Sequence, residues 1–181
     1  LITAIGPGAR IYLYHIPPIA IVGIPPTLAA RLHADFPDQI VGIKDSSGDW
    51  DNTQELLAIE SMIVYPGSEL PLLDAMALGA PGCISATANL NAKMISTVID
   101  RYQQGDIGSA EALHEDLKRF RLIVEEHGPI PAQKRLLAIA TGDPRWGNVR
   151  PPLTSMPEEA GRKLAAVLKR DCNFEISAGG G

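Results

Sequence analysis

The chain of 181 residues is poor in the residues that most often mark metal or redox chemistry. It has two cysteines and four histidines, and only 5% of its residues are aromatic. Cys83 and Cys172 belong to no metal-ligand pattern, and the histidines lack the i, i+4 pairing of a helical zinc site. We therefore expect no metal, no cofactor and a reducing, cytoplasmic environment.

Long apolar runs and an excess of positive charge are also lacking. No apolar run approaches the roughly 20 residues that a membrane-spanning helix needs. The formal net charge is −5, which argues against nucleic acid or an anionic membrane as the main partner. The 45% hydrophobic residues are sufficient for a globular core.

Lys44 is the most informative residue that is present. It closes the apolar run Ile40–Lys44 and is followed by the polar stretch Asp45–Asp49, which contains a glycine. This pattern predicts an amine at the carboxyl end of a buried strand, where α/β folds normally carry their chemistry. An amine that loses hydration there favours its neutral, nucleophilic form. Taken alone, such a lysine is more often a surface residue with an apolar stem.

The first part of the sequence alternates between β-prone and helical patterns. Strands are expected at residues 11–14, 40–44, 62–65 and 82–86, and helices at 27–36, 52–59, 69–78 and 92–103. Asp51 is the expected cap of the second of these helices. Four β-then-α units imply parallel strands with right-handed crossovers. Because a closed barrel takes about eight strands, we expect this chain to be the second half of a longer fold.

The sequence after Gly105 predicts helices and no further strands. Apolar residues recur on one helical face over residues 107–126, and further helices are expected at 132–140 and 157–168. Ser155 and Glu158 have the spacing of a capping box for the last of these. The expected division is therefore residues 1–105, a helical domain at 106–176, and a disordered tail at 177–181.

Six motifs follow one another along the chain, four of them at the ends of expected strands. They are Tyr14-His15-Ile16-Pro17, Gly42–Asp49, Tyr65–Glu69, Gly82–Asn89, Gly128–Pro131 and Val149–Leu153. In order and spacing, the set resembles the dihydrodipicolinate synthase / N-acetylneuraminate lyase family of pyruvate-type class I aldolases, from about Ile2 to Leu168. The resemblance implies an α/β fold: strands five to eight of a (β/α)8 TIM barrel, followed by a C-terminal helical bundle. It also implies a homo-oligomer, either a tetramer or a dimer.

The resemblance assigns roles to individual residues. Lys44 matches the lysine that forms a Schiff base with pyruvate or another 2-oxo acid, and Tyr14 matches the tyrosine that relays protons. The remaining matches would line the pocket for the 2-oxo acid and its aldehyde partner: Gly42, Ser46, Gly67, Glu69 and Ile84. Gly42 would leave room for the ligand, since it points to the same side as Lys44.

The chain departs from the family pattern at three positions. Ile19 stands where dihydrodipicolinate synthases have an arginine, and Leu70 where sialic acid lyases tend to have an acid, so both of these substrates are disfavoured. Ile21 stands where a glycine is usual, which bears on the shape of this loop. The motif Lys44–Asp49 is more similar to members that act on 2-oxo-3-deoxy sugar acids, and such an acid is the expected substrate. The alternatives are dihydrodipicolinate synthase, an imine enzyme that dehydrates or hydrates, and a non-catalytic fragment or assembly module.

Overall fold

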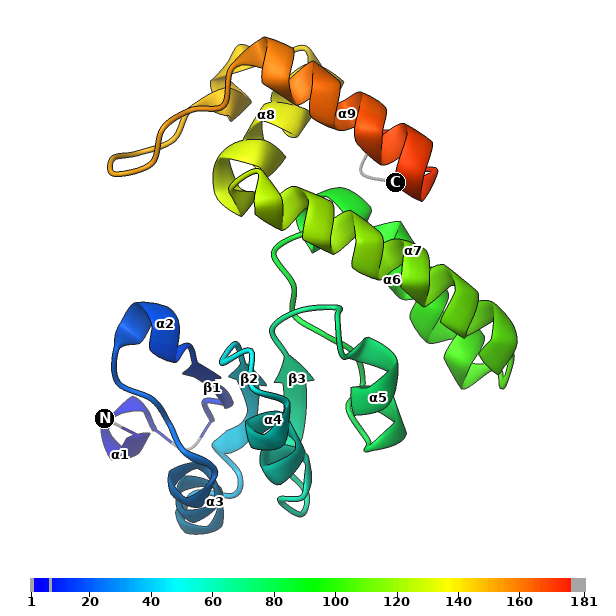
Figure 1. The fold of residues 1–181 in the computed structure, drawn as a ribbon. Coiled ribbons are helices and arrows are strands. Elements are labelled where there is room, and N and C mark those ends of the chain that lie inside the picture. Colours follow the sequence, from blue (N-terminus) through cyan, green and yellow to red (C-terminus); the bar gives the residue numbers. More distant parts are fainter. Residues whose placement is uncertain (1, 7, 177–181) are drawn as a thin grey trace. The chain divides into compact units, whose positions relative to one another are not determined.

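The computed structural model describes residues 2–6 and 8–176, and the tail expected to be disordered, residues 177–181, lies outside them. The chain divides into two compact units, residues 1–85 and 86–181 (Figure 1). The expected boundary after residue 105, which rests on the end of the strand pattern at Gly105, stays a prediction. The helix at residues 88–103, which was expected in the first domain, lies within the second compact unit.

A parallel sheet forms the centre of the first unit. Its strands are β1 (Ile11–His15), β2 (Ile40–Asp45) and β3 (Ile63–Pro66), in the order β1-β2-β3. These three expected strands, and their parallel direction, are confirmed. In the register, Tyr14 lies opposite Lys44, and Lys44 lies opposite Tyr65.

Two helices of the first unit pack against one face of this sheet. Figure 1 shows α3 (Pro26–Asp35) and α4 (Trp50–Leu57) beside the strands, and α5 (Leu72–Ala77) follows β3. The short helices α1 (Ile2–Ile5) and α2 (Pro17–Ala20) flank β1 in sequence. Because strand side chains alternate, one face of the sheet supplies the core with Ile43 and Val64, which pack with Ala29, Ile40, Leu56 and Met62. The opposite face exposes Tyr12, Tyr14 and Ile63.

The prediction of a fourth strand at residues 82–86 is wrong. The structure assigns no strand there, and one backbone hydrogen bond, from Ile84 N–H to the Pro66 carbonyl (3.0 Å), links the segment to the end of β3. A parallel ladder requires a series of such bonds along both strands. The segment is also rich in small residues, which have low strand propensity.

Several helix starts and caps also differ from the predictions. The helices expected at 92–103 and 132–140 begin at Ala88 and Pro129. Asp49, not Asp51, caps α4, because its carboxylate accepts from the backbone N–H groups of Asp51 (3.0 Å) and Asn52 (3.4 Å). Helix α5 begins at Leu72 rather than near residue 69, with Pro71 at its N-cap. The expected cap by Ser155 is not formed, since Pro157 is the N-cap of the last helix and no side chain accepts there.

The second unit is built from helices. They are α6 (Ala88–Gln103), α7 (Ile107–Glu126), α8 (Pro129–Thr141), the short 3₁₀ helix η1 (Pro144–Gly147) and α9 (Glu158–Cys172). The bounds expected for α7 are confirmed. Its buried stripe packs with α8 and α9 in a core formed by Phe120, Val124, Leu136, Leu164 and Leu168. Among the described residues, no helix is both long and apolar enough to cross a bilayer.

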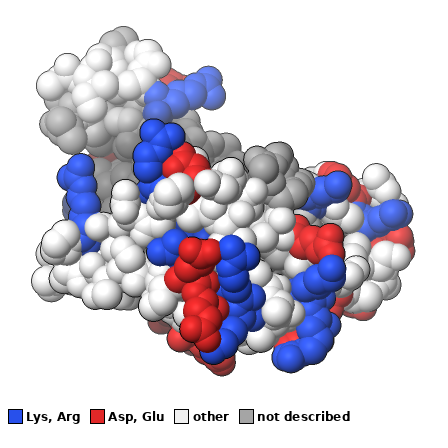
Figure 2. All heavy atoms as spheres, turned by 90° about the horizontal axis from the view of Figure 1, so that it is seen from above, with Lys and Arg blue, Asp and Glu red and all other residues white. Residues whose placement is uncertain are grey.

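Charges of both signs alternate on the surface of the helical unit. Figure 2 shows Lys and Arg side chains lying beside Asp and Glu side chains on the visible face. The pairs include Glu158–Arg162 (2.6 Å) and Glu159–Lys163 (2.7 Å), one helical turn apart on α9. Such exposed pairs contribute little stability individually, on the order of 0.3–0.5 kcal/mol.

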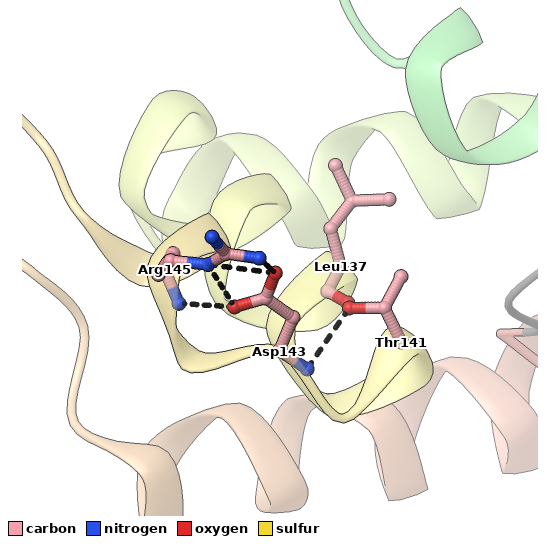
Figure 3. A network of polar contacts seen from close by, with 4 residues as sticks. All are labelled: Leu137, Thr141, Asp143 and Arg145. Atoms are coloured by element: carbon pink, nitrogen blue, oxygen red, sulfur yellow. Dashed lines mark hydrogen bonds and ion pairs between the residues drawn. The ribbon is translucent and has the colours of Figure 1, made fainter.

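A polar network closes the turn after α8 (Figure 3). Thr141 Oγ1 donates to the Leu137 carbonyl (2.8 Å) and accepts from the Asp143 N–H (3.3 Å). The Asp143 carboxylate accepts from the backbone N–H of Arg145 (3.0 Å), which caps η1, and from its guanidinium (2.7 Å). These hydrogen bonds from Arg145 lower the pKa of Asp143. The turn is therefore set by side-chain bonds to the backbone.

Gly42 provides a test of packing within the sheet. A Cβ at this position would overlap the Ile63 carbonyl oxygen and lie 2.5 Å from the Tyr12 ring. We expect Gly42→Ala to lower the free energy of unfolding by roughly 1–3 kcal/mol, as overpacking does, in urea denaturation. Gly8→Ala is the matched control, because a Cβ there meets no described atom within 4 Å. Equal stabilities of the two variants would contradict this packing.

The cap of α4 provides a second test. Asp49→Ala removes the acceptor of two N–H groups and should cost about 1 kcal/mol of unfolding free energy. Asp51→Ala should cost less, since Asp51 only interacts with the helix dipole from the first turn. Asp49→Asn retains the acceptor and should retain most of the stability. A larger loss for Asp51→Ala than for Asp49→Ala would reverse the assignment of the cap.

Candidate active site

Lys44 and Tyr14 meet on the exposed face of the sheet. They lie opposite each other in the parallel pairing of β1 and β2. Lys44 Nζ donates to the Tyr14 hydroxyl at 3.3 Å and lies 4.5 Å from the centroid of its ring. The two residues that sequence analysis proposed for catalysis are thus in direct contact, with Tyr14 48% exposed.

The surroundings of Tyr14 make its hydroxyl more acidic than that of an ordinary tyrosine. Partial burial acts to raise the pKa of Tyr14, but hydrogen bonds with Ser46 and Lys44 and the positive charge of Lys44 outweigh it. The net effect is a lowered pKa for Tyr14. A phenol of this kind exchanges its proton more readily, which suits a proton relay.

Ser46 and Gly67 lie close together at the carboxyl ends of β2 and β3. The Ser46 N–H donates to the His15 carbonyl (2.7 Å), and the Gly67 N–H donates to the Asp45 carbonyl (2.6 Å). A Cβ on Gly67 would overlap Ser46 Oγ. Glycine at residue 67 therefore allows the Ser46 hydroxyl to occupy this position next to Tyr14.

Asp45 fixes the loop that follows Lys44. Its buried carboxylate accepts from the Ser47 N–H (2.9 Å), from Asn52 Nδ2 (3.1 Å) and from Thr53 Oγ1 (2.6 Å). A buried carboxylate requires such donors, since leaving it without them is costly. The loop and the first turn of α4 are thus held by one side chain adjacent to Lys44.

Gly42 has a different neighbour from the one expected. The space above it, which we assigned to a ligand, is filled by the Tyr12 ring. Tyr12 also lies beside Tyr65, with ring centroids 6.0 Å apart and a tilt of 52°. Sequence analysis did not assign Tyr12 to the site, although its position two residues before Tyr14 puts both on one strand face.

Glu69 and Ile84 lie in different environments. Glu69 is fully buried, and its carboxylate accepts a hydrogen bond from Ser85 Oγ. It would have to become exposed to touch a substrate. Ile84 is 42% exposed, and its backbone is bonded to the end of β3. The contact between Ser85 and Glu69 was missed, because the sequence separates the two residues by sixteen positions.

His15 is a further residue that sequence analysis did not assign to the site. It follows Tyr14, is 7% exposed, and accepts the Ile24 N–H at Nδ1 (2.7 Å). It thereby ties the segment after β1 back to the strand that carries Tyr14. Among residues 2–6 and 8–176, no three His, Cys, Asp or Glu side chains converge closely enough to hold a metal ion.

These features define a class of protein: a parallel α/β unit with a lysine and a tyrosine in contact at the carboxyl ends of adjacent strands. The sequence pattern of the Dihydrodipicolinate synthetase family matches residues 5–171. The chain belongs to this family, as the motifs led us to expect.

Curated relatives and solved structures agree with this membership. A 4-hydroxy-tetrahydrodipicolinate synthase of Thermodesulfovibrio yellowstonii is 33% identical over 165 residues, which are 90% of this chain and 55% of that protein. An uncharacterized DapA-like lyase of Chloroflexus aurantiacus is 33% identical over 172 residues, 94% of this chain and 56% of that protein. The chain thus spans about half the length of the curated relatives it matches.

The fold matches part of the TIM barrel of solved dihydrodipicolinate synthases. A putative dihydrodipicolinate synthase from Thermus thermophilus matches with a TM-score of 0.76 and 29% identity, over 93% of this chain and 59% of that one. YagE of Escherichia coli, solved in complex with pyruvate, matches with a TM-score of 0.76 and 21% identity, over 89% and 55%. At that identity the likeness to YagE concerns the fold alone.

The contacts of Tyr14 lead to a titration experiment. We expect the pKa of Tyr14, followed by tyrosinate absorbance with Tyr14→Phe to identify its contribution, to rise in Ser46→Ala and in Lys44→Met. Each substitution removes a contact that stabilises the phenolate. Lys93→Met on α6 should leave the titration unchanged. A Tyr14 curve that is the same in all three variants would contradict the contacts described here.

Proposed function

We propose that this chain provides the imine-forming residues of a class I aldolase or lyase acting on pyruvate or another 2-oxo acid. The observation that carries the proposal is the contact between Lys44 Nζ and the Tyr14 hydroxyl at 3.3 Å. Within this proposal, the three parallel strands of the first unit belong to the second half of a (β/α)8 barrel. The second unit corresponds to the helical bundle of a homo-oligomer, a tetramer or a dimer.

The chemistry follows from an amine beside a phenol. The neutral Lys44 amine adds to the C2 ketone of the 2-oxo acid, and the carbinolamine loses water to form an iminium ion. The iminium accepts the electron pair when the C3–C4 bond breaks and an aldehyde leaves. In the other direction, C3 loses a proton and the resulting enamine attacks an aldehyde. In this mechanism Tyr14 donates and recovers the proton at the substrate oxygen.

The neighbours of Lys44 support this role. The parallel pairing of β1 with β2 and the bonds of the Asp45 carboxylate hold Lys44, Tyr14 and Ser46 in place before a substrate arrives. Such preorganisation reduces the entropic cost of reaching a reactive geometry. The Ser46 hydroxyl, bonded to Tyr14, extends the relay by one further exchangeable proton.

The sequence leaves two candidates for the part of the substrate beyond C4. The hydroxyl groups of Ser46 and Ser47 favour a 2-oxo-3-deoxy sugar acid, whose polyol would accept and donate hydrogen bonds. The alternative is a dihydrodipicolinate synthase, the activity named for several relatives. Ile19 carries no charge to bind the carboxylate that we expect this reaction to require.

A second function has a specific observation in its favour. The chain matches only about 55% of the length of its relatives, and the sheet face with Tyr12, Tyr14 and Ile63 is exposed. A non-catalytic fragment or assembly module would fit both facts. On this view the 181-residue chain alone condenses poorly with 2-oxo acids and turns over neither direction of the aldol reaction.

Reductive trapping separates the two functions. We expect pyruvate plus borohydride to add one pyruvate-derived group to the protein, detected by mass spectrometry and mapped to Lys44. Lys44→Ala should abolish the adduct and Lys93→Ala should retain it. Tyr14→Phe should slow its formation by about 10²–10⁴-fold, the range of general acid–base catalysis.

Two outcomes would contradict the imine proposal. The first is an unmodified mass with the purified chain and with any longer form that contains it. The second is an adduct that persists in Lys44→Ala. Adduct formation without aldol turnover by the 181-residue chain would support the fragment interpretation for the isolated chain, and turnover by that chain as a verified monomer would refute it.

A further inference from the structure

Lys44 lies in the upper of two neighbouring layers of side chains on one face of the sheet. Residues that lie opposite one another in parallel strands share a face, and so do residues two positions apart. The pairing therefore defines a lower layer of Tyr12, Gly42 and Ile63 and, toward the carboxyl ends of the strands, an upper layer of Tyr14, Lys44 and Tyr65. Lys44 stands between two tyrosines of its own layer, and the layer beneath it contains a third.

A bulge in β2 produces this arrangement. The register shifts by one residue between Ile11 and Tyr12, which leaves Val41 as an extra residue of β2. In an unbroken strand Ile40 and Ile43 would point to opposite faces, whereas both are buried in the same core. The extra residue keeps both isoleucines in the core and turns the glycine and the lysine beside them to the other face. Bulges are frequent next to active sites, where they redirect a side chain.

The ring of Tyr12 fills the space below Lys44. A Cβ on Gly42 would lie 2.5 Å from Tyr12 Cε1 and 2.7 Å from Tyr12 Cδ1, so the ring lies directly over this glycine of β2. On the far side the ring reaches Tyr65 on β3, with the two ring centroids 6.0 Å apart, a distance typical of aromatic contacts. One side chain of β1 thus extends across β2 to β3 in the layer next to the amine.

Such a neighbour restricts the direction of the Lys44 side chain. The flexible four-carbon stem of a lysine gives its amine many positions, and over a bare glycine it could fold back along its own strand. The Tyr12 ring occupies that space. Lys44 Nζ lies instead 3.3 Å from the Tyr14 hydroxyl and 4.5 Å from the centroid of the Tyr14 ring. The amine is therefore turned toward the phenol of its own layer.

We infer that Tyr12 is a positioning residue, whose ring, supported by Tyr65, holds the Lys44 amine against Tyr14 in the geometry that imine formation needs. The inference rests on the proposed function and adds to it a residue that acts through Lys44 rather than on the substrate. Both of these contacts of Tyr12 are made by its ring, so the ring and not the hydroxyl is required. Excluding other positions of the amine before the substrate arrives lowers the entropic cost of the reaction.

The titration of Tyr14 reports the position of the amine without any substrate. Burial acts to raise the pKa of Tyr14, and hydrogen bonds with Ser46 and Lys44 and the charge of Lys44 outweigh it. We expect Tyr12→Leu, whose short side chain does not reach Tyr65, to raise the pKa of Tyr14 toward that of the Lys44→Met variant. Tyr12→Phe should leave it unchanged. The measurement is tyrosinate absorbance, with Tyr14→Phe made in each background to isolate the contribution of Tyr14.

Reductive trapping reports the consequence for reactivity. The experiment uses pyruvate and borohydride with the form of the protein, 181 residues or longer, that traps pyruvate at Lys44. Tyr12→Leu should lower the maximal rate of adduct formation about tenfold, within the loss that misplaced reacting groups cause. The pyruvate concentration at half-saturation should stay the same, because Tyr12 acts on the amine and not on pyruvate. Tyr12→Phe should trap at the original rate, and Tyr65→Leu, which removes the support of the ring, should resemble Tyr12→Leu.

Leu13→Ala is the control for a general loss of stability. Leu13 lies on β1 between the two tyrosines, but its side chain packs against the core on the other face of the sheet. We expect Leu13→Ala to lower the midpoint of thermal unfolding at least as much as Tyr12→Leu does, with no change in the titration of Tyr14 or in the rate of trapping. If Tyr12→Leu does not fold, Tyr65→Leu gives both readouts in its place.

The outcomes separate this inference from the function on which it rests. Trapping of pyruvate at the original rate by folded Tyr12→Leu, or equal effects of Leu13→Ala and Tyr12→Leu on both readouts, would overturn the inference alone. An unchanged titration of Tyr14 in both Tyr12→Leu and Tyr65→Leu would do the same. If no form of the protein traps pyruvate, the proposed function fails and the inference fails with it.

Discussion

The parallel register of β1 and β2 is the constraint on which the rest of the site depends. It places Tyr14 opposite Lys44, and neighbouring strands lie about 4.8 Å apart, so two long side chains on the same face can touch. A shift of one residue would turn one of them toward the helices. The buried faces of Ile43 and Val64 against α3 and α4 oppose such a shift.

Gly42 and Gly67 allow close contacts between neighbouring strands, and these contacts are compatible with the same register. At Gly42 the missing side chain admits the Tyr12 ring across the β1–β2 pair, and at Gly67 it admits the Ser46 hydroxyl across the β2–β3 pair. Each glycine is therefore explained by a neighbour on, or directly after, an adjacent strand. The family resemblance had assigned both to a bound ligand, and the structure adds a packing reason that holds with or without one.

Local sequence patterns were sufficient to predict some of the helices and strands. The buried stripe of α7 follows a helical repeat, and the approximate bounds of this helix could be predicted from it. The strands around Tyr14 and Lys44 were predicted because each is a short β-prone run that ends in polar residues. The roles of the pair were implied by the resemblance of the motifs at the strand ends to the family, and the carboxyl ends of parallel strands share one edge.

The features that could not be predicted depend on contacts between residues that are distant in the sequence. Residues 82–86 stand where the alternation of strands and helices predicts a fourth strand, but pairing needs a series of bonds to a neighbouring strand, and the backbone bond that links this segment to β3 is the single one from Ile84 to Pro66. The full burial of Glu69 depends on where Ser85 lies, which no local pattern reports. Asp51 and Asp49 are both suitable caps, and the choice between them depends on where β2 and its loop end.

The carboxylate of Asp45 also connects two parts of the molecule mechanically. It is bonded at once to the loop at Ser47 and to Thr53 in α4, and Ser46 lies between the strand and that loop. A rotation or translation of α4 would therefore reorient the hydroxyl next to Tyr14. Substitutions on the outer side of this helix, remote from any reacting atom, would then alter reactivity through displacement alone.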